Sequence, residues 1–273
     1  MTIITLNLLQ AGYCTQYEKL AITGGAFRKI KFPAVFGLID HSRLGYILFD
    51  TGYSERFYRL TSTFPESVYA KLTPVTIAPY QSAVAQLQGL GIAASEIKWI
   101  IISHFHPDHI GGLRDFPEAQ LIYKRSAYQN LVRKKRLAAL ASGFLPGLLP
   151  EDFEARSRDI ENDSVISLPE PYAPFCRAYD ILGDGSLLLV DLPGHAQGQL
   201  GLFLSTQRGR FFLISDACWL KQSYQTSTPP KGLARLATNH WGDYLRTLKK
   251  INRLHQRCPE IAIIPSHQNI AFL

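Results

Sequence analysis

Three histidines and an aspartate lie within six positions of the chain, in the stretch ISHFHPDHIGG at residues 102–112. They are His104, His106, Asp108 and His109, and the whole sequence of 273 residues has only eight histidines. Imidazole and carboxylate groups are ligands that zinc, iron and manganese take in proteins. We therefore predict a metal site at this stretch.

The residues around the cluster would place its side chains together at a strand end. The preceding run, IKWIII, indicates a buried strand, and His104 and His106 project to one side of it because side chains alternate. Pro107 ends the strand, since it has no N–H to donate. On the turn that follows, Asp108 and His109 can point back toward the same space. A buried set of this kind is costly unless a metal ion pairs with it.

Five segments of the chain, in order, resemble the metallo-β-lactamase-fold hydrolases. SHFHPDHIGGL resembles the signature of that family, and LFDTGY resembles the strand and turn before it. LPGHAQGQLGL, FFLISDACW and AIIPSHQ resemble the segments that carry its later ligands. The resemblance runs from about residue 34 to 270. It implies an α/β fold, an αββα sandwich, in which residues 1–273 form a single domain.

The resemblance also implies a ligand set for two divalent ions, most often zinc, with iron or manganese as alternatives. One ion would take His104, His106 and His195. The other would take Asp108, His109 and His267, with Asp216 bridging the two. Such a pair of ions supplies a hydroxide nucleophile and polarises a substrate oxygen, so the reaction class is hydrolysis, with Asp108 as the candidate proton carrier. Asp50 either supports the site or serves only its turn.

Within the family we favour the lactonase-like branch, similar to N-acyl-homoserine-lactone and pyridoxolactone hydrolases. Classical β-lactamases often use a cysteine ligand and lack the bridging aspartate, and flavo-diiron proteins resemble HxExDH, where this chain has His106. Glyoxalase II-like thioesterases carry a C-terminal extension, and this sequence ends six residues after His267. The alternatives are a thioesterase or phosphodiesterase on the same site, and a metal-containing regulatory or binding protein.

Four residues are candidates for substrate binding. Many such lactonases have a tyrosine three positions after the bridging aspartate, where this chain has Trp219, and Tyr224 could supply a hydroxyl from the following loop. Residues 124–176 lack a clear counterpart in the family, and we expect an inserted helical or lid region. Its run GFLPGLLP offers Phe144 and Leu148 as exposed apolar side chains. This favours a lid that lines the substrate cavity, with a homodimer contact or core packing as alternatives.

The composition excludes several other classes of protein. With 46% hydrophobic and 19% charged residues the chain is globular. Its formal charge of +7 is concentrated at residues 124–136 and 231–257, which we interpret as solvated helix faces, because no RNA-binding signature accompanies them. Scattered cysteines, no basic leader and no long apolar run predict a cytoplasmic protein without a membrane partner, acting on a small molecule.

Irregularly alternating strands and helices must position these residues, which suggests layered sheets covered by helices. The expected strands are residues 2–9, 34–40, 44–50, 97–103, 119–123, 177–182, 186–192, 200–204, 210–215 and 261–265. The expected helices are residues 54–60, 79–90, 126–141 and 240–257. A hairpin turn is expected at HSRLG, residues 41–45.

Overall fold

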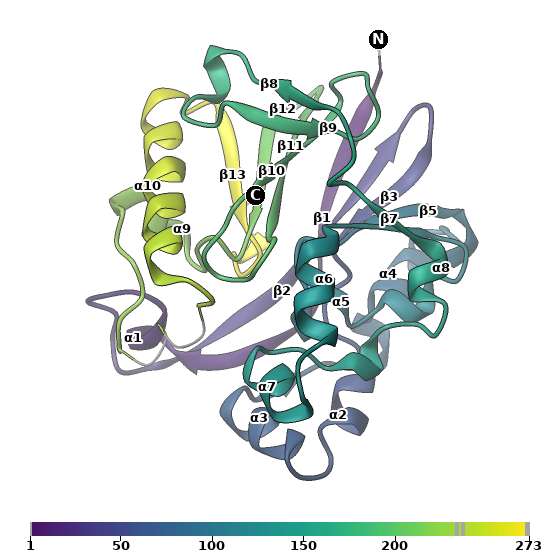
Figure 1. The fold of residues 1–273 in the computed structure, drawn as a ribbon, viewed down its shortest axis with the longest axis vertical. Helices are drawn as coiled ribbons and strands as arrows, with labels where there is room; N and C mark the ends of the chain where they lie inside the picture. Colours follow the sequence, from purple (N-terminus) through teal and green to yellow (C-terminus); the bar gives the residue numbers. More distant parts are fainter. Residues whose placement is uncertain (1, 233–234, 236–237, 271–273) are drawn as a thin grey trace.

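Two β-sheets lie face to face, and helices cover their outer faces (Figure 1). The structure is a computed structural model, and it describes residues 2–232, 235 and 238–270. The amino-terminal half of the chain supplies one sheet, and the carboxy-terminal half supplies the other. This architecture is the predicted αββα sandwich.

The first sheet has seven strands among the described residues. Their order is β4 (Val75–Thr76), β1 (Ile4–Tyr17), β2 (Lys29–His41), β3 (Gly45–Phe49), β5 (Ile97–Ile101), β6 (Gln120–Tyr123) and β7 (Ser157–Asp159). β2 and β3 form the predicted hairpin, whereas β3, β5, β6 and β7 are parallel neighbours. Because parallel strands end at one edge of a sheet, the segments that follow β3 and β5 meet there.

The second sheet has six strands in the described part of the chain. Their order is β13 (Ile261–Pro265), β12 (Gly209–Ser215), β11 (Leu200–Thr206), β10 (Leu187–Asp191), β9 (Arg177–Asp180) and β8 (Val165–Ser167). Its strands are antiparallel except for β12 and β13. The chain therefore leaves both of these strands at the same edge.

Helices flank the two sheets. The helices that follow strands of the amino-terminal half are α1 (Glu18–Ala21), α2 (Arg56–Leu60), α3 (Glu66–Leu72), α4 (Ala83–Gly89), α5 (Pro107–Ile110), α6 (Arg125–Val132), α7 (Arg136–Ala141) and α8 (Phe153–Arg156). The second sheet is covered by α9 (Lys221–Thr226) and α10 (Trp241–Arg257).

Apolar side chains fill three layers. Between the sheets, Ile39 and Ile101 of the first sheet pack in one cluster with Leu189 and Leu202 of the second. Outside the first sheet, strand residues pack with residues of α2, α4 and α6, and outside the second sheet they pack with α9 and α10. The burial of both faces explains why most strands read as continuous apolar runs in the sequence.

Several elements differ from the sequence-based expectation: β2 begins at Lys29 and not at residue 34, β4, β7 and β8 were not expected, and two further differences have a clear cause. β1 was expected to end at residue 9, but it continues to Tyr17 across a bulge between Gln10 and Tyr13, where Gly12 has φ 74°. The bulge shifts the inward-facing set of residues, so a single alternation could not reveal the whole strand. The helix expected over residues 126–141 is two helices, because the backbone is extended at Lys135.

Residues 124–176 contribute one strand to each of the two sheets. The segment contains α6, α7 and α8, but β7 pairs with β6 in the first sheet and β8 pairs with β9 in the second. The two short strands thus anchor the stretch that the sequence suggested was an inserted helical region.

Candidate metal centre

The histidine cluster lies where β5 ends and α5 begins. His106 is the N-cap of α5 in an extended conformation, and Pro107 occupies the first helical position, where a missing N–H costs nothing. The helix is one turn long, and the His109 N–H bonds to the His106 carbonyl at 3.0 Å. This strand, turn and helix direct His104, His106, Asp108 and His109 into one space, as their spacing predicted.

Three further candidate ligands reach the same space from the second sheet. His195 follows β10, Asp216 follows β12, and His267 follows β13. The parallel pairing of β12 and β13 brings the last two side by side, with His267 Nε2 at 3.2 Å from Asp216 Oδ2. His195 Nε2 lies 3.3 Å from the same oxygen. All three side chains are buried.

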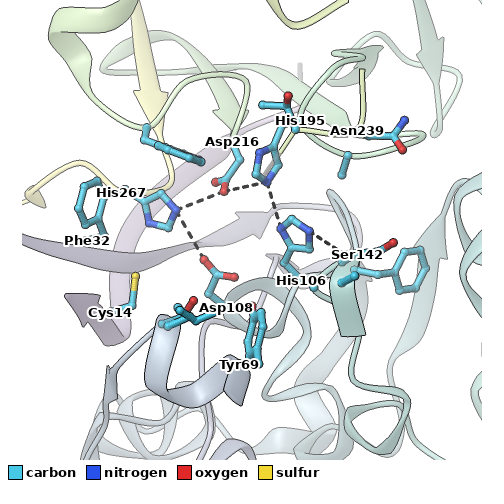
Figure 2. A pocket seen from close by; sticks show the side chains of 18 of the residues that line it. Cys14, Phe32, Tyr69, His106, Asp108, Ser142, His195, Asp216, Asn239 and His267 are labelled. Carbon is cyan, nitrogen blue, oxygen red and sulfur yellow. Dashed lines mark hydrogen bonds and ion pairs between the residues drawn. The ribbon is translucent and has the colours of Figure 1, made fainter. Parts of the chain in front are cut away.

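The seven candidate ligands form two overlapping groups that share Asp216. Figure 2 shows His106, Asp108, His195, Asp216 and His267 pointing toward one another. One group is His104, His106, His195 and Asp216, and the other includes Asp108, Asp216 and His267, with all ligand atoms of a group within 4.8 Å of one another. His109 joins the second group, because its Nε2 lies 3.5 Å from Asp108 Oδ2 and 3.4 Å from Asp216 Oδ1.

The donor atoms fit divalent metal ions. His104 Nε2, His109 Nε2 and Asp216 Oδ1 are buried without a hydrogen-bond partner among the described residues, although such atoms are nearly always paired in proteins. His106 Nδ1 and His195 Nε2 face each other at 3.0 Å, an arrangement that two neutral imidazoles sharing one cation would also adopt. Two metal ions, one in each ligand group, would together satisfy all five atoms.

Burial sets the protonation of the imidazoles. Burial lowers the pKa of His104 well below its usual value and that of His195 to about 3, so both rings are neutral near pH 7. Burial also acts to lower the pKa of His109, but the carboxylates around it, Asp108 first, raise that pKa well above its usual value. Neutral rings are the form that binds metals, and a divalent ion supplies positive charge to the carboxylates in place of a proton.

Asp50 supports the site through hydrogen bonds. Its Oδ1 accepts from the Ser103 N–H at 2.8 Å, and its Oδ2 accepts from Ser103 Oγ at 2.7 Å and from His109 Nδ1 at 2.8 Å. These bonds direct His109 Nε2 toward the metal centre. Of the two roles that the sequence left open for Asp50, the geometry favours support of the site.

Two serines were missed by the sequence analysis. Ser103 Oγ lies 2.8 Å from Ser215 Oγ, and both hydroxyls contact His104 Nδ1, at 3.1 and 3.2 Å. They therefore orient that ring and join the ends of β5 and β12. A signal existed in the sequence, because a serine directly precedes His104, Asp216 and His267.

A cavity of about 750 Å³ opens over the ligands. Phe32 and Cys14 lie on one side of it, near His267, whereas Ser142 and Asn239 lie on the other, near His106 and His195 (Figure 2). Burial raises the pKa of the Cys14 thiol to about 12, so it stays protonated and unreactive. The cavity is large enough for a substrate of drug-like size.

The four candidate substrate residues fall in different places. Trp219 lines the cavity, with its ring 5.9 Å from that of His195. Tyr224 is 2% exposed, and its hydroxyl donates to the Ile263 carbonyl of β13, so it does not line this cavity. Phe144 and Leu148 do not line it either.

The expectation that Phe144 and Leu148 are exposed is wrong. They are 1% and 0% exposed and belong to the cluster outside the first sheet, where Phe144 meets the ring of Phe105 edge-on at 6.2 Å. The reason is the turn at Gly143, whose φ of 67° sends the apolar run inward. Ser142 and Gly143, just before this run, are the residues that border the cavity.

Comparison with known proteins agrees with this site. The family model described as the metallo-beta-lactamase superfamily matches residues 32–267. The chain belongs to this superfamily. The match runs from Phe32, which lines the cavity, to His267, the last candidate ligand.

Curated members of the superfamily resemble nearly the whole chain. The N-acyl homoserine lactonase AttM of Azorhizobium caulinodans is 26% identical over 94% of this chain and 90% of its own length. An N-acyl homoserine lactonase of Bacillus thuringiensis is 26% identical over 85% of this chain and 83% of its own length. The family match and these homologues confirm the prediction of a metal-dependent, lactonase-like hydrolase.

Solved structures share the fold. A mutant of AiiA from B. thuringiensis with N-decanoyl-L-homoserine at its active site is 20% identical, with a TM-score of 0.73 over 98% of this chain and 94% of that one. An N-acyl homoserine lactone hydrolase with N-hexanoyl-L-homoserine at its catalytic metal center has 21% identity and a TM-score of 0.72 over the same shares.

Within the described residues, no helix is both long and apolar enough to cross a membrane.

Proposed function

We propose that the protein opens the ring of a lactone by hydrolysis, with two divalent ions, most often zinc, as cofactors. The single observation that carries this proposal is the shared position of Asp216 in two groups of buried ligands. A carboxylate with an oxygen toward each group is what a pair of ions needs as a bridge. The names of the curated relatives, N-acyl homoserine lactonases, support a lactone as the substrate class.

The chain's own residues would divide the work. Two ions held by the two ligand groups would supply an activated water molecule and a Lewis acid for a carbonyl oxygen. Water adds to the ring carbonyl carbon, the ring C–O bond breaks, and the product is a hydroxy acid. Asp108 lies against both His109 and His267, and in this proposal it takes the proton from water and delivers it to the departing ring oxygen. Trp219 can donate its indole N–H to the substrate.

The cavity wall gives this chemistry its selectivity. Leu20, Phe32, Tyr69 and Leu72 line it and offer apolar surface to any substituent on the ring. Their burial against a substituent would contribute about 25 cal/mol for each Å² removed from water. We also propose a cytoplasmic location, supported by the four unpaired cysteines.

A substrate panel tests the proposal. Protein reconstituted with zinc is assayed against lactones with short and long acyl substituents, a thioester and a phosphodiester. We expect the lactones to have the highest kcat/KM. The variant His267→Gln should lose most of this activity, and the matched variant His255→Gln, in the last turn of α10 and outside both ligand groups, should keep it. Preference for the thioester or phosphodiester, or full activity in His267→Gln, would overturn the proposal.

A further inference from the structure

The end of α6 and the bend after it border the cavity with polar side chains. Asn130 lies in the last turn of α6, Lys134 follows two residues after the helix ends at Val132, and both line the cavity. One turn before Asn130, Ala127 packs so closely on Gly198 that a Cβ at this glycine would lie 2.7 Å from the alanine Cβ. The helix and the loop that carries His195 therefore form one continuous wall.

Lys134 is held close to the metal centre. Its Nζ donates to Ser142 Oγ at 2.6 Å, and the carbonyl of the same serine lies 3.2 Å from His106 Nε2. Figure 2 shows Ser142 beside His106, facing the cavity. The ammonium group thus lies only one residue away from a candidate ligand.

Three of the other cations in residues 124–136 have acidic partners, and the remaining two, Arg133 and Lys135, do not line the cavity. Lys124 pairs with Asp191 at 2.5 Å, Arg125 with Asp159 at 3.2 Å, and Arg136 with Glu66 at 2.6 Å. Lys134 makes no ion pair within the described part of the chain, and no other described lysine or arginine lines the cavity. A partly buried ammonium gains most from a carboxylate, because such a hydrogen bond is charge-assisted.

The wall opposite the apolar side of the cavity adds neutral donors. Gln197 and Asn239 line it from the second sheet, and the Asn239 N–H is anchored to the His195 carbonyl at 2.8 Å. These amides can bind a carboxylate beside Lys134 without adding charge. The two sides of the cavity therefore differ in polarity. Lys134 and Asn239 lie near His106 and His195, and the apolar ring of Phe32 lies near His267.

We propose that this enzyme selects lactones that carry an anionic substituent, a carboxylate, beside the ring, and that Lys134 is the residue that binds it. This inference rests on the proposed function and narrows its substrate class. A neutral N-acyl homoserine lactone would leave the ammonium without a charged partner. Lys134 is a specificity residue in this proposal, and it takes no part in bond breaking.

A matched pair of substrates tests the proposal. The pair is a γ-butyrolactone with a ring carboxylate and the same lactone with a carboxamide in its place. For the wild-type protein we expect kcat/KM to be about 10- to 100-fold higher for the carboxylate, the range of a hydrogen bond to a charged group. In Lys134→Met, KM for the carboxylate should rise by about the same factor, with kcat nearly unchanged and the carboxamide unaffected. Lys134→Arg should restore part of the preference.

The control variant is Lys135→Met, which removes an exposed neighbouring charge that does not line the cavity. Equal loss for both substrates in Lys134→Met, or no wild-type preference for the carboxylate, would overturn the inference. Turnover of the carboxamide alone keeps the proposed function and rejects the inference, whereas no turnover of any lactone rejects the proposed function. Calorimetry with the hydroxy dicarboxylate product tests the role of Lys134 without any turnover. If Lys134 binds the carboxylate, this product must bind more weakly to Lys134→Met than to the wild-type protein.

Discussion

The variant Asp50→Asn measures how far one residue outside the ligand set controls metal binding. Asp50 is fully buried, and its two oxygens accept three hydrogen bonds. Asparagine has nearly the same volume and tolerates the left-handed φ of 63° at this position. The substitution therefore keeps the backbone and changes only the Oδ2 acceptor, which faces His109 Nδ1 and Ser103 Oγ.

The expected loss of metal affinity follows from which ring nitrogen of His109 carries the proton. If the amide oxygen keeps the Ser103 N–H, the amide nitrogen faces His109 Nδ1 and can only donate to it. The ring must then carry its proton on Nε2, the atom directed at the metal centre. We expect the affinity of the ion at this histidine to fall about 10- to 100-fold. This corresponds to about 1.4–2.7 kcal/mol of binding free energy.

Competition with a chelating dye measures this affinity directly. The matched control is Asp40→Asn, an exposed aspartate on β2, which should bind zinc as the wild-type protein does. Unchanged affinity in Asp50→Asn would refute the reasoning, because it would mean that Asp50 does not fix the tautomer of His109. Equal weakening in both variants would point to a general effect of charge.

Four further outcomes are expected. Elemental analysis of reconstituted protein should give about two ions per chain, and a value near one without gain on reconstitution would contradict the bridging role of Asp216. Asp108→Asn should lower kcat about 10²- to 10⁴-fold in steady-state assays, whereas near-wild-type turnover with both ions retained would assign the proton to another group. Gly143→Ala should lower kcat/KM more than tenfold, because the new Cβ would lie 2.6 Å from His106 Cδ2 at a φ of 67°; an unchanged value would show that this ring can shift freely. Phe144→Ala should lower the free energy of unfolding by about 3–5 kcal/mol in denaturant titrations, as core truncations do, and a small loss with a raised KM would restore the lid interpretation.

The part of the site that is local in sequence could be predicted from the sequence. His104, His106, Asp108 and His109 follow one strand, and their geometry depends only on alternation and a proline-led turn. The support by Asp50 could not be settled in this way. Its contact with His109 joins positions 59 apart and depends on the parallel pairing of β3 with β5.

Secondary structure was predicted correctly where the burial of one face of an element determines its hydrophobic pattern. It was missed where contacts with residues far away in sequence determine the structure. No glycine or proline marks the break between α6 and α7, and the extended backbone at Lys135 gives no signal in composition. The run GFLPGLLP was read as exposed because it is apolar and broken. Its burial depends on helices and strands that lie far from it in sequence, among them the ring of Phe105.

The candidate ligands are divided unevenly between the two halves of the chain, and this has a consequence for how the protein reaches its folded state. Residues 104–109 supply four ligands in one short stretch, so even an unfolded chain keeps a partial chelator. An ion bound there before folding reduces the net stabilisation that the same ion gives to the native state. The carboxy-terminal half adds His195, Asp216 and His267 only after its sheet has formed. In a growing chain, the metal can therefore be captured by the first half and then act as a template on which the second half closes.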